Sequence, residues 1–225
     1  MNQPTQVSLI DQTRIPLDVD IYVGAMRARQ RVMAAWRRLS AQLKAEWSLG
    51  RAMVMWWRRK IADFEIEPQC HSYWCWAAVA ASVSAFYDET STFSQCRIAN
   101  LELHRQDCCT FDCGANGVEF NIMHTLGSAL NRAGRLKRLV RFQRATRAEV
   151  QQEIRARRPL CVRTIWSGGG AHFVVIVGYS PDDDSLVIAD PWRGKIFEVP
   201  FDRFCSQFSP EEGLNGMWND TYYTR

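Results

Sequence analysis

Four residues whose side chains could carry out acyl transfer stand at separate places in the chain: Gln69, Cys75, His172 and Asp190. Cys75 comes directly before a run of small and apolar residues that predicts a helix. Its thiol would therefore lie at the positive end of a helix dipole, beside unpaired backbone N–H groups, a setting that favours the nucleophilic thiolate. A cysteine, a histidine and a carboxylate in this order are the parts of a hydrolase with a cysteine nucleophile.

Each of the four residues has a distinct expected role. Cys75 is the candidate nucleophile, and His172 is the candidate base, which as imidazolium would hold the thiolate in an ion pair. Asp190 would accept a hydrogen bond from the far ring nitrogen of His172 and so fix its tautomer. Gln69 would donate a side-chain N–H to the oxyanion, together with the backbone N–H of Cys75.

The elements around Cys75 are expected to be helices. Residues 62–69 are predicted to be an extended segment that ends at Pro68, and apolar periodicity predicts three helices after it. We place these helices at residues 75–87, at 93–104 with Ser94 as a possible cap, and at 118–131.

The elements around His172 and Asp190 are expected to be strands. Residues 139–142, 160–166, 172–179, 185–189 and 195–199 have strand patterns, and Tyr222 and Tyr223 could close the sheet. Two further helices are expected, one opened by a capping box at Thr146–Glu149 and a short one that Asp202 caps and that runs to Phe208. Helices followed by an antiparallel sheet indicate an α+β domain with a cleft between its two parts.

The charge of the chain is uneven. The 225 residues are 47% hydrophobic, which is enough for a packed core, and the formal net charge is +4. Residues 1–61 hold 11 Lys or Arg against 4 Asp or Glu, whereas residues 62–225 hold 17 against 20. We therefore divide the chain into a basic N-terminal segment, 1–61, and a body, 62–225.

Residues 21–61 of the basic segment repeat apolar residues at steps of three and four, which predicts a helical stripe. Three interpretations are open. The segment could be a structural arm, a pro-segment that covers the cleft, or a surface for an acidic partner or a membrane. No nucleic-acid motif is present, so nucleic-acid binding is not expected.

The N-terminus has no pattern of a cleavable secretory signal, so we expect a cytoplasmic protein or one exported without such a signal. Eight cysteines leave reduced thiols and disulfides both open. His104, Cys108, Cys109 and Cys113 have a spacing that could hold zinc, but it is irregular, and we expect structural thiols or a disulfide there and no metal or other cofactor.

The residues resemble the papain-like cysteine peptidases over roughly residues 62–225. Gln69 stands six residues before Cys75-Trp-Ala, His172 begins an apolar strand after glycines, and Asp190-Pro-Trp192 is similar to the family's Asn-Ser-Trp element. Asp in place of Asn is a departure from papain that is similar to two bacterial branches, the self-processing effector proteases and the peptidases that trim bacteriocin leaders. The pairs Gln95-Cys96 and Ala99-Asn100 and the adjacent Cys108 and Cys109 look most like the effector branch.

This resemblance implies a papain-like fold and an endopeptidase that acts on proteins or peptides through an acyl-enzyme. Self-processing and a role as a bacterial effector or toxin are part of that expectation. Two alternatives stay open: another thiol acyl-transfer enzyme, such as an amidase, deamidase or transglutaminase, and a non-catalytic, metal-stabilised binding module. His71 is a rival base close to Cys75, but it precedes the helix and is expected to point away from the thiol.

Overall fold

The structure is a computed structural model that describes residues 59–115, 118–209 and 215–225. All of these belong to the second of two compact units, Met53–Arg225. The expected basic segment lies outside the described residues except for its last three. Those three correct one prediction: Arg59–Lys60 form strand β1, which pairs with β4, so the helical stripe does not continue to Ile61.

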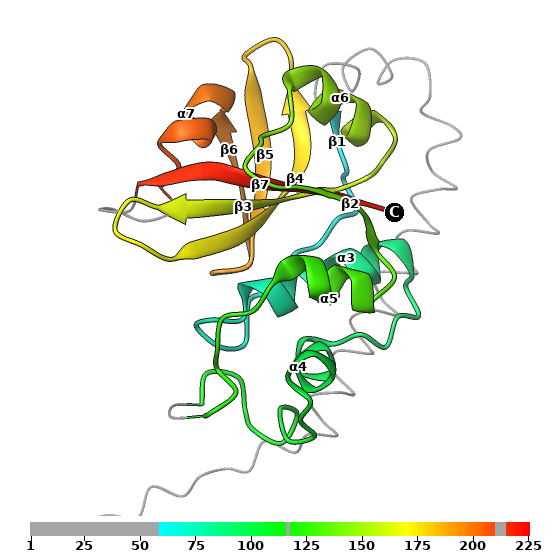
Figure 1. Ribbon diagram of the computed structural model, residues 1–225. Helices are drawn as coiled ribbons and strands as arrows, with labels where there is room; N and C mark the ends of the chain where they lie inside the picture. Colours follow the sequence, from blue (N-terminus) through cyan, green and yellow to red (C-terminus); the bar gives the residue numbers. More distant parts are fainter. Residues whose placement is uncertain (1–58, 116–117, 210–214) are drawn as a thin grey trace, which may run out of the picture. The chain divides into compact units, whose positions relative to one another are not determined.

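The helical half of the unit consists of three helices that pack on one another (Figure 1). They are α3 (Cys75–Tyr87), α4 (Gln95–Leu103) and α5 (Leu126–Arg132). The bounds predicted for α3 are confirmed at both ends, and the Ser94 side chain caps α4 by accepting a hydrogen bond from the Arg97 backbone. Helix α3 is buried along most of its length, because most residues of its first three turns are alanine or valine.

The third helix is shorter than predicted. We expected it to begin at Val118, but α5 begins only after Thr125, and residues 118–125 form an irregular segment. The carbonyl oxygens of Phe120 and Ile122 accept hydrogen bonds from the indole N–H groups of Trp74 and Trp76. These carbonyls are thus engaged by side chains from the start of α3 instead of by an intrahelical ladder.

The other half is one antiparallel sheet with the strand order β2-β7-β3-β4-β5-β6, with β1 added to β4. In addition to β1, the sheet contains β2 (Leu136–Val140), β3 (Leu160–Trp166), β4 (Ala171–Ser180), β5 (Ser185–Asp190), β6 (Lys195–Pro200) and β7 (Gly216–Thr224). The predicted strands are confirmed within a few residues, and Tyr222 and Tyr223 do join the sheet, between β2 and β3.

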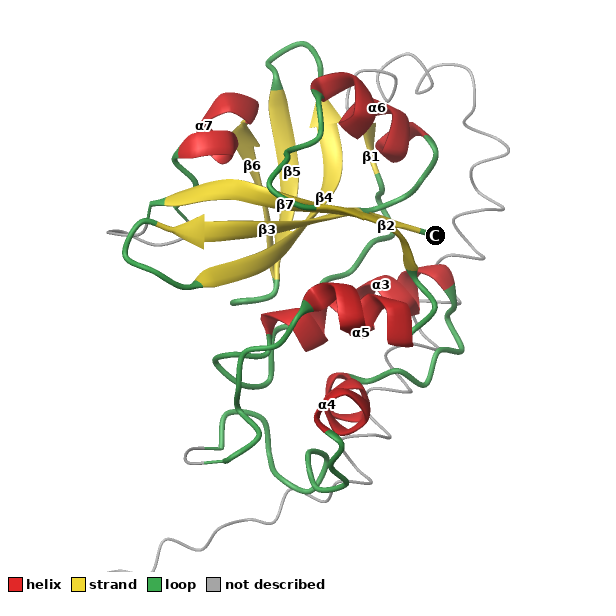
Figure 2. Ribbon diagram, viewed as in Figure 1, coloured by secondary structure: helices red, strands yellow, loops and turns green. Residues whose placement is uncertain are grey.

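Two more helices, α6 (Arg147–Arg155) and α7 (Phe201–Ser206), pack against the sheet. The expected capping box between Thr146 and Glu149 is present. The prediction for α7 was wrong at both ends, because Asp202 lies inside the helix, whose N-cap is Pro200, and the helix ends at Ser206. Figure 2 shows the sheet with α6 and α7 on one side of the unit and α3, α4 and α5 on the other. The predicted α+β architecture is therefore confirmed. None of the helices in the described part of the chain is long and apolar enough to cross a membrane.

Two disulfides fix the loops of the helical half. Cys70 is bonded to Cys113, and Cys96 is bonded to Cys109. Cys109 and Cys113 thus bond to partners outside the cluster that we considered for zinc. Within the described ranges, no group of three or more His, Cys, Asp or Glu side chains is arranged to hold a metal ion.

Candidate active site

Cys75 is the first residue of α3, and α3 packs against β4. The backbone N–H groups in the first turn of a helix have no intrahelical acceptors, so the site at Cys75 has N–H donors available. Cys75 is 7% exposed and lines a cleft. The other three free cysteines, Cys108, Cys161 and Cys205, are buried, and burial raises the pKa of each thiol, so they remain protonated.

His172 and Asp190 come together because their strands are neighbours. In the antiparallel pair of β4 and β5, Val175 lies opposite Ala189. One further step of this register places Asp190 opposite Val174, two residues from His172, so the side chains of His172 and Asp190 share one face of the sheet. Nε2 of His172 lies 2.7 Å from Oδ1 of Asp190.

His172 and Cys75 line the same cleft, and the Cys75 thiol is close enough to the imidazole to raise its pKa. Because Nε2 is taken by Asp190, the remaining ring nitrogen, Nδ1, is the one available to the thiol. Burial by itself would lower the pKa of His172, but the hydrogen bonds and charges of Asp190 and Cys75 outweigh it and raise the pKa to about 10. The arrangement therefore stabilises an imidazolium between a thiol and a carboxylate.

Asp190 is held from a second direction. Its Oδ1 also accepts the backbone N–H of Trp192 at 2.8 Å, so the turn after β5 fixes the carboxylate. The Trp192 side chain is at the rim of the cleft and is 42% exposed. The aromatic ring that stacks on the His172 ring is instead that of Trp166, with centroids 6.2 Å apart.

Trp166 is a residue of the site that the sequence reasoning missed. It is the last residue of β3, and the turn Gly168–Gly170 returns the chain to β4. Because Thr164 pairs with His172 in this hairpin, Trp166 lies close to the histidine. Gly169 and Gly170 line the cleft with φ values of 92° and 89°, a conformation that side chains with a Cβ rarely adopt. The sequence did contain a signal that could have identified Trp166 as a residue of the site: it ends a predicted strand and is followed by the glycines that precede His172.

Gln69 lies beside the loop before α3. Its Nε2 donates to the carbonyl oxygens of His71 at 2.9 Å and of Ser72 at 2.7 Å, while its Oε1 is buried without a partner. Gln69 does not line the cleft, whereas Ser72 does. An N–H of Gln69 would have to turn from these carbonyls to reach an oxyanion, so its expected role remains a prediction.

His71, the rival base, is packed away from the cleft. Its ring contacts Trp74 and Phe120 edge-on and is not part of the cleft lining. Burial lowers the pKa of His71, which favours its neutral form. His172 lines the cleft together with Cys75, so it and not His71 is the candidate base.

The cleft has a volume of about 1000 Å³ and is lined from both halves. The helical half contributes the loop before α3 and the start of α5, and the sheet half contributes β2, β3, β4 and β7. Exposed apolar side chains at its surface include Tyr73, Met123 and Phe142. The volume is at the upper end of the range for ligand cavities, which suits an extended substrate.

Residues 57–209, about two thirds of the chain, match the family model described as papain-like cysteine protease AvrRpt2. The chain belongs to this family. This papain-like cysteine peptidase is also similar to the crystal structure of xylellain, a cysteine protease from Xylella fastidiosa. That similarity has a TM-score of 0.42 and 12% identity, over 74% of this chain and 85% of that chain. No curated protein shows a significant match.

The family model therefore confirms the expected class of enzyme, a papain-like cysteine protease of the bacterial effector type. Its match begins at residue 57 and thus includes β1, which precedes the boundary that we drew at residue 62. A cysteine protease acts on proteins or peptides, in agreement with the expected class of substrate.

Proposed function

We propose that this peptidase is an endopeptidase in which Cys75, His172 and Asp190 form the catalytic triad. The observation that carries the proposal is that His172, which lies 2.7 Å from the Asp190 carboxylate, lines the same cleft as Cys75 and has its pKa raised by both residues. The raised pKa of His172 supports an ion pair in which the proton of the thiol rests on the imidazole.

In the first half of the reaction, the Cys75 sulfur attacks the carbonyl carbon of the scissile peptide bond. The negative charge that develops on the carbonyl oxygen is stabilised by N–H donors at the start of α3, with Gln69 as a second donor once its amide turns. Nδ1 of His172 then gives its proton to the leaving nitrogen, the C–N bond breaks, and a thioester remains on Cys75.

In the second half, the neutral His172 takes a proton from a water molecule that attacks the thioester carbon. The C–S bond breaks, the acid product leaves, and the proton returns to the pair of Cys75 and His172. Asp190 stays ionised throughout and keeps Nε2 of His172 protonated, so that Nδ1 carries out both proton transfers.

The chain itself is one substrate within this proposal. If the peptidase cleaves its own N-terminal segment, the wild-type protein will be shorter than the 25.9 kDa chain after expression, whereas Cys75→Ala will keep its full mass. Equal masses for the two proteins would remove self-processing and leave the endopeptidase proposal to the test that follows.

The two disulfides support action outside the cytoplasm, as an exported effector or toxin, because disulfides persist in oxidising compartments. Mass spectrometry after alkylation in a denaturant without a reductant tests this: protein from the medium should take up four labels, on the four free cysteines. Eight labels on protein recovered only from the cytosol would contradict export.

The triad is tested by labelling with an epoxide inhibitor of thiol proteases, together with hydrolysis of a peptide library. Wild type should take one label and cleave internal peptide bonds, and Cys75→Ala should do neither. Cys161→Ala is the matched control, because this buried thiol is not among the residues that line the cleft. Equal labelling of wild type and Cys75→Ala would exclude Cys75 as the nucleophile. Hydrolysis of small amides without cleavage of peptides would favour an amidase.

A further inference from the structure

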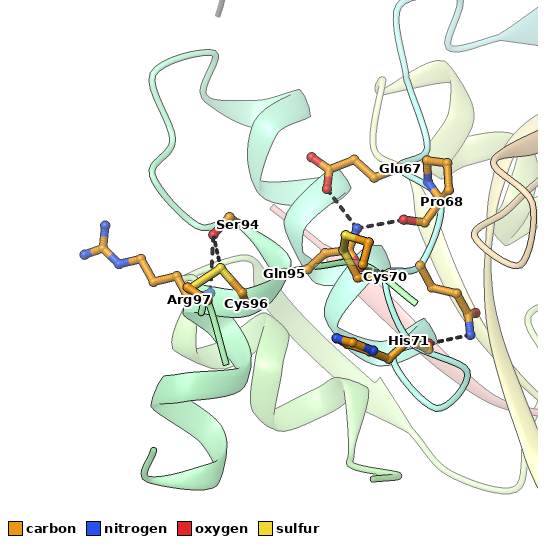
Figure 3. The surroundings of a disulfide bond; sticks show 11 residues. Glu67, Pro68, Cys70, His71, Ser94, Gln95, Cys96 and Arg97 are labelled. Atoms are coloured by element: carbon orange, nitrogen blue, oxygen red, sulfur yellow. Dashed lines mark hydrogen bonds between the residues drawn. A yellow bond between two sulfur atoms is a disulfide. The ribbon is translucent and has the colours of Figure 1, made fainter. Parts of the chain in front are cut away.

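The segment that carries Gln69 has no helix or strand of its own. Residues 62–69 follow β1 and precede the first turn of α3 without regular hydrogen bonding. The backbone on both sides of Gln69 is instead held by one side chain, that of Gln95 (Figure 3). Its Oε1 accepts the N–H of Cys70 at 2.9 Å, and its Nε2 donates to the carbonyl oxygen of Pro68 at 2.8 Å.

Gln95 is well placed to hold this segment firmly. It is only 6% exposed, and Nε2 makes a third contact, 3.1 Å from the carboxylate of Glu67. It is the first residue of α4, next to the Ser94 cap. The adjacent Cys96 is bonded to Cys109, so the base of this side chain is anchored by a capped helix and by a disulfide.

The contacts of Gln69 depend on the backbone that Gln95 holds. The N–H of Gln69 donates to the carbonyl oxygen of Pro191 at 2.7 Å, next to Asp190. Its side-chain amide bonds to the loop before Cys75. A shift of Pro68 or Cys70 would therefore move the amide relative to the thiol, and displacements near 1 Å are enough to impair catalysis.

His172 and Asp190 are held in a different way. They lie on the paired strands β4 and β5, so the ladder positions them without any contribution from Gln95. The position of Gln69 and the position of the triad are thus separable in this fold.

We propose that Gln95 is a positioning residue that acts on catalysis through Gln69, by fixing Pro68 and Cys70 so that the Gln69 amide can serve the oxyanion. This inference rests on the proposed function. It assigns to the Gln95-Cys96 pair a task that the triad does not explain. It also predicts that loss of Gln95 impairs acyl transfer while the nucleophile stays intact.

The test compares Gln95→Met, which keeps the size of the side chain but removes its hydrogen bonds, with wild type and with Gln152→Met. Gln152 is an exposed glutamine on α6 and serves as the matched control. Two rates are measured: kcat for a cleaved peptide, and alkylation of Cys75 by iodoacetamide, a displacement at carbon that forms no oxyanion. We expect kcat to fall roughly 10-fold to 100-fold, KM to change by less than about threefold, and alkylation to stay within about twofold.

A double variant shows whether Gln95 acts through Gln69. If it does, the effects of Gln95→Met and Gln69→Ala on kcat are not additive, and the double variant is about as slow as Gln69→Ala alone. Additive losses, or an alkylation rate that falls in parallel with kcat, would overturn the inference because they would indicate a general effect on the fold or on the triad.

Gln95→Glu keeps the inference testable if Gln95→Met does not fold. A protonated carboxyl can accept from the Cys70 N–H and donate to the Pro68 carbonyl, whereas a carboxylate cannot donate. The ratio of the variant's kcat to that of wild type should therefore rise as the pH falls, and a ratio independent of pH would contradict the proposal. If wild type itself neither cleaves peptides nor takes the epoxide label, the proposed function fails instead.

Discussion

Nε2 of His172 lies 2.7 Å from Oδ1 of Asp190, and the two residues are only 7% and 3% exposed. Removal of either residue would leave the other as a buried charge without its partner, which would destabilise the folded protein. The same oxygen also accepts the N–H of Trp192. The carboxylate therefore orients the imidazole of His172 and also holds the backbone of the turn after β5.

Replacement of Asp190 separates its charge from its hydrogen bonds. In Asp190→Asn, the amide oxygen can still accept from His172 and Trp192, but the negative charge that helps to raise the pKa of His172 is gone. We expect Asp190→Asn to be at least about 10-fold more active than Asp190→Ala. As the pH falls, the alkylation of Cys75 should decline at a higher pH in Asp190→Asn than in wild type, because a less stabilised imidazolium holds the thiolate less well.

Rates of iodoacetamide alkylation between pH 5 and pH 10 check this prediction. Asp220→Asn, a change at an acidic residue of the cleft lining outside the triad, is the control for a general loss of negative charge. Indistinguishable rates for Asp190→Asn and Asp190→Ala would show that the hydrogen bonds retained by asparagine contribute nothing.

The raised pKa of His172 makes the stability of the protein depend on pH. The folded pKa, about 10, lies above that of an unfolded histidine, about 6.5. The stabilisation is therefore fully present below about pH 6.5 and is lost as the pH rises through about 10. Urea unfolding at pH 6, 8 and 10 should show a decline of a few kcal/mol in the free energy of unfolding of wild type.

His172→Gln should lack the part of this decline that comes from the imidazole. Because groups that do not interact with His172 titrate equally in both proteins, the difference between the two curves isolates His172 together with its direct partners. Parallel curves from pH 6 to pH 10 would refute the assignment of the raised pKa.

Removal of the disulfides should destabilise the helical half to different extents. Cys70 and Cys113 are 43 residues apart and Cys96 and Cys109 are 13 apart, so the loop-closure model gives about 4 and about 3 kcal/mol. Thermal unfolding of the double variants Cys70→Ser/Cys113→Ser and Cys96→Ser/Cys109→Ser should give the larger decrease in Tm for the first pair. With a reductant, wild type should unfold below both. A Tm that no reductant changes would mean that the disulfides are not formed.

A methyl group at Gly194 should disturb the contact between the turn after Asp190 and the segment before Cys75. Gly194 has φ 62°, and an added Cβ would lie 2.8 Å from Cγ of Pro68. Gly134 has a similar φ of 69° but open space around it, so Gly134→Ala measures the backbone strain alone. We expect Gly194→Ala to cost about 1–3 kcal/mol more in chemical denaturation than Gly134→Ala. Equal costs would show that Pro68 can move aside freely.

Much of this protein was determined by the sequence itself. Periodicity and capping placed α3, α6 and most strands, because these patterns are local consequences of which faces are buried. The pattern failed at residues 118–125, where the indoles of Trp74 and Trp76 take backbone acceptors from far along the chain. Cys75, His172 and Asp190 could be selected by residue type, by neighbours and by resemblance to a known family.

Tertiary structure decided what these residues do to one another. Only the register of β4 and β5 brings Nε2 of His172 to Asp190, and only the packing of α3 on β4 brings the thiol to the ring. The pairing of Cys70 with Cys113 and the hold of Gln95 on Pro68 and Cys70 depend on distances that no local pattern encodes. The physical reason is that short-range preferences fix the elements, whereas packing between distant elements fixes the contacts of their side chains.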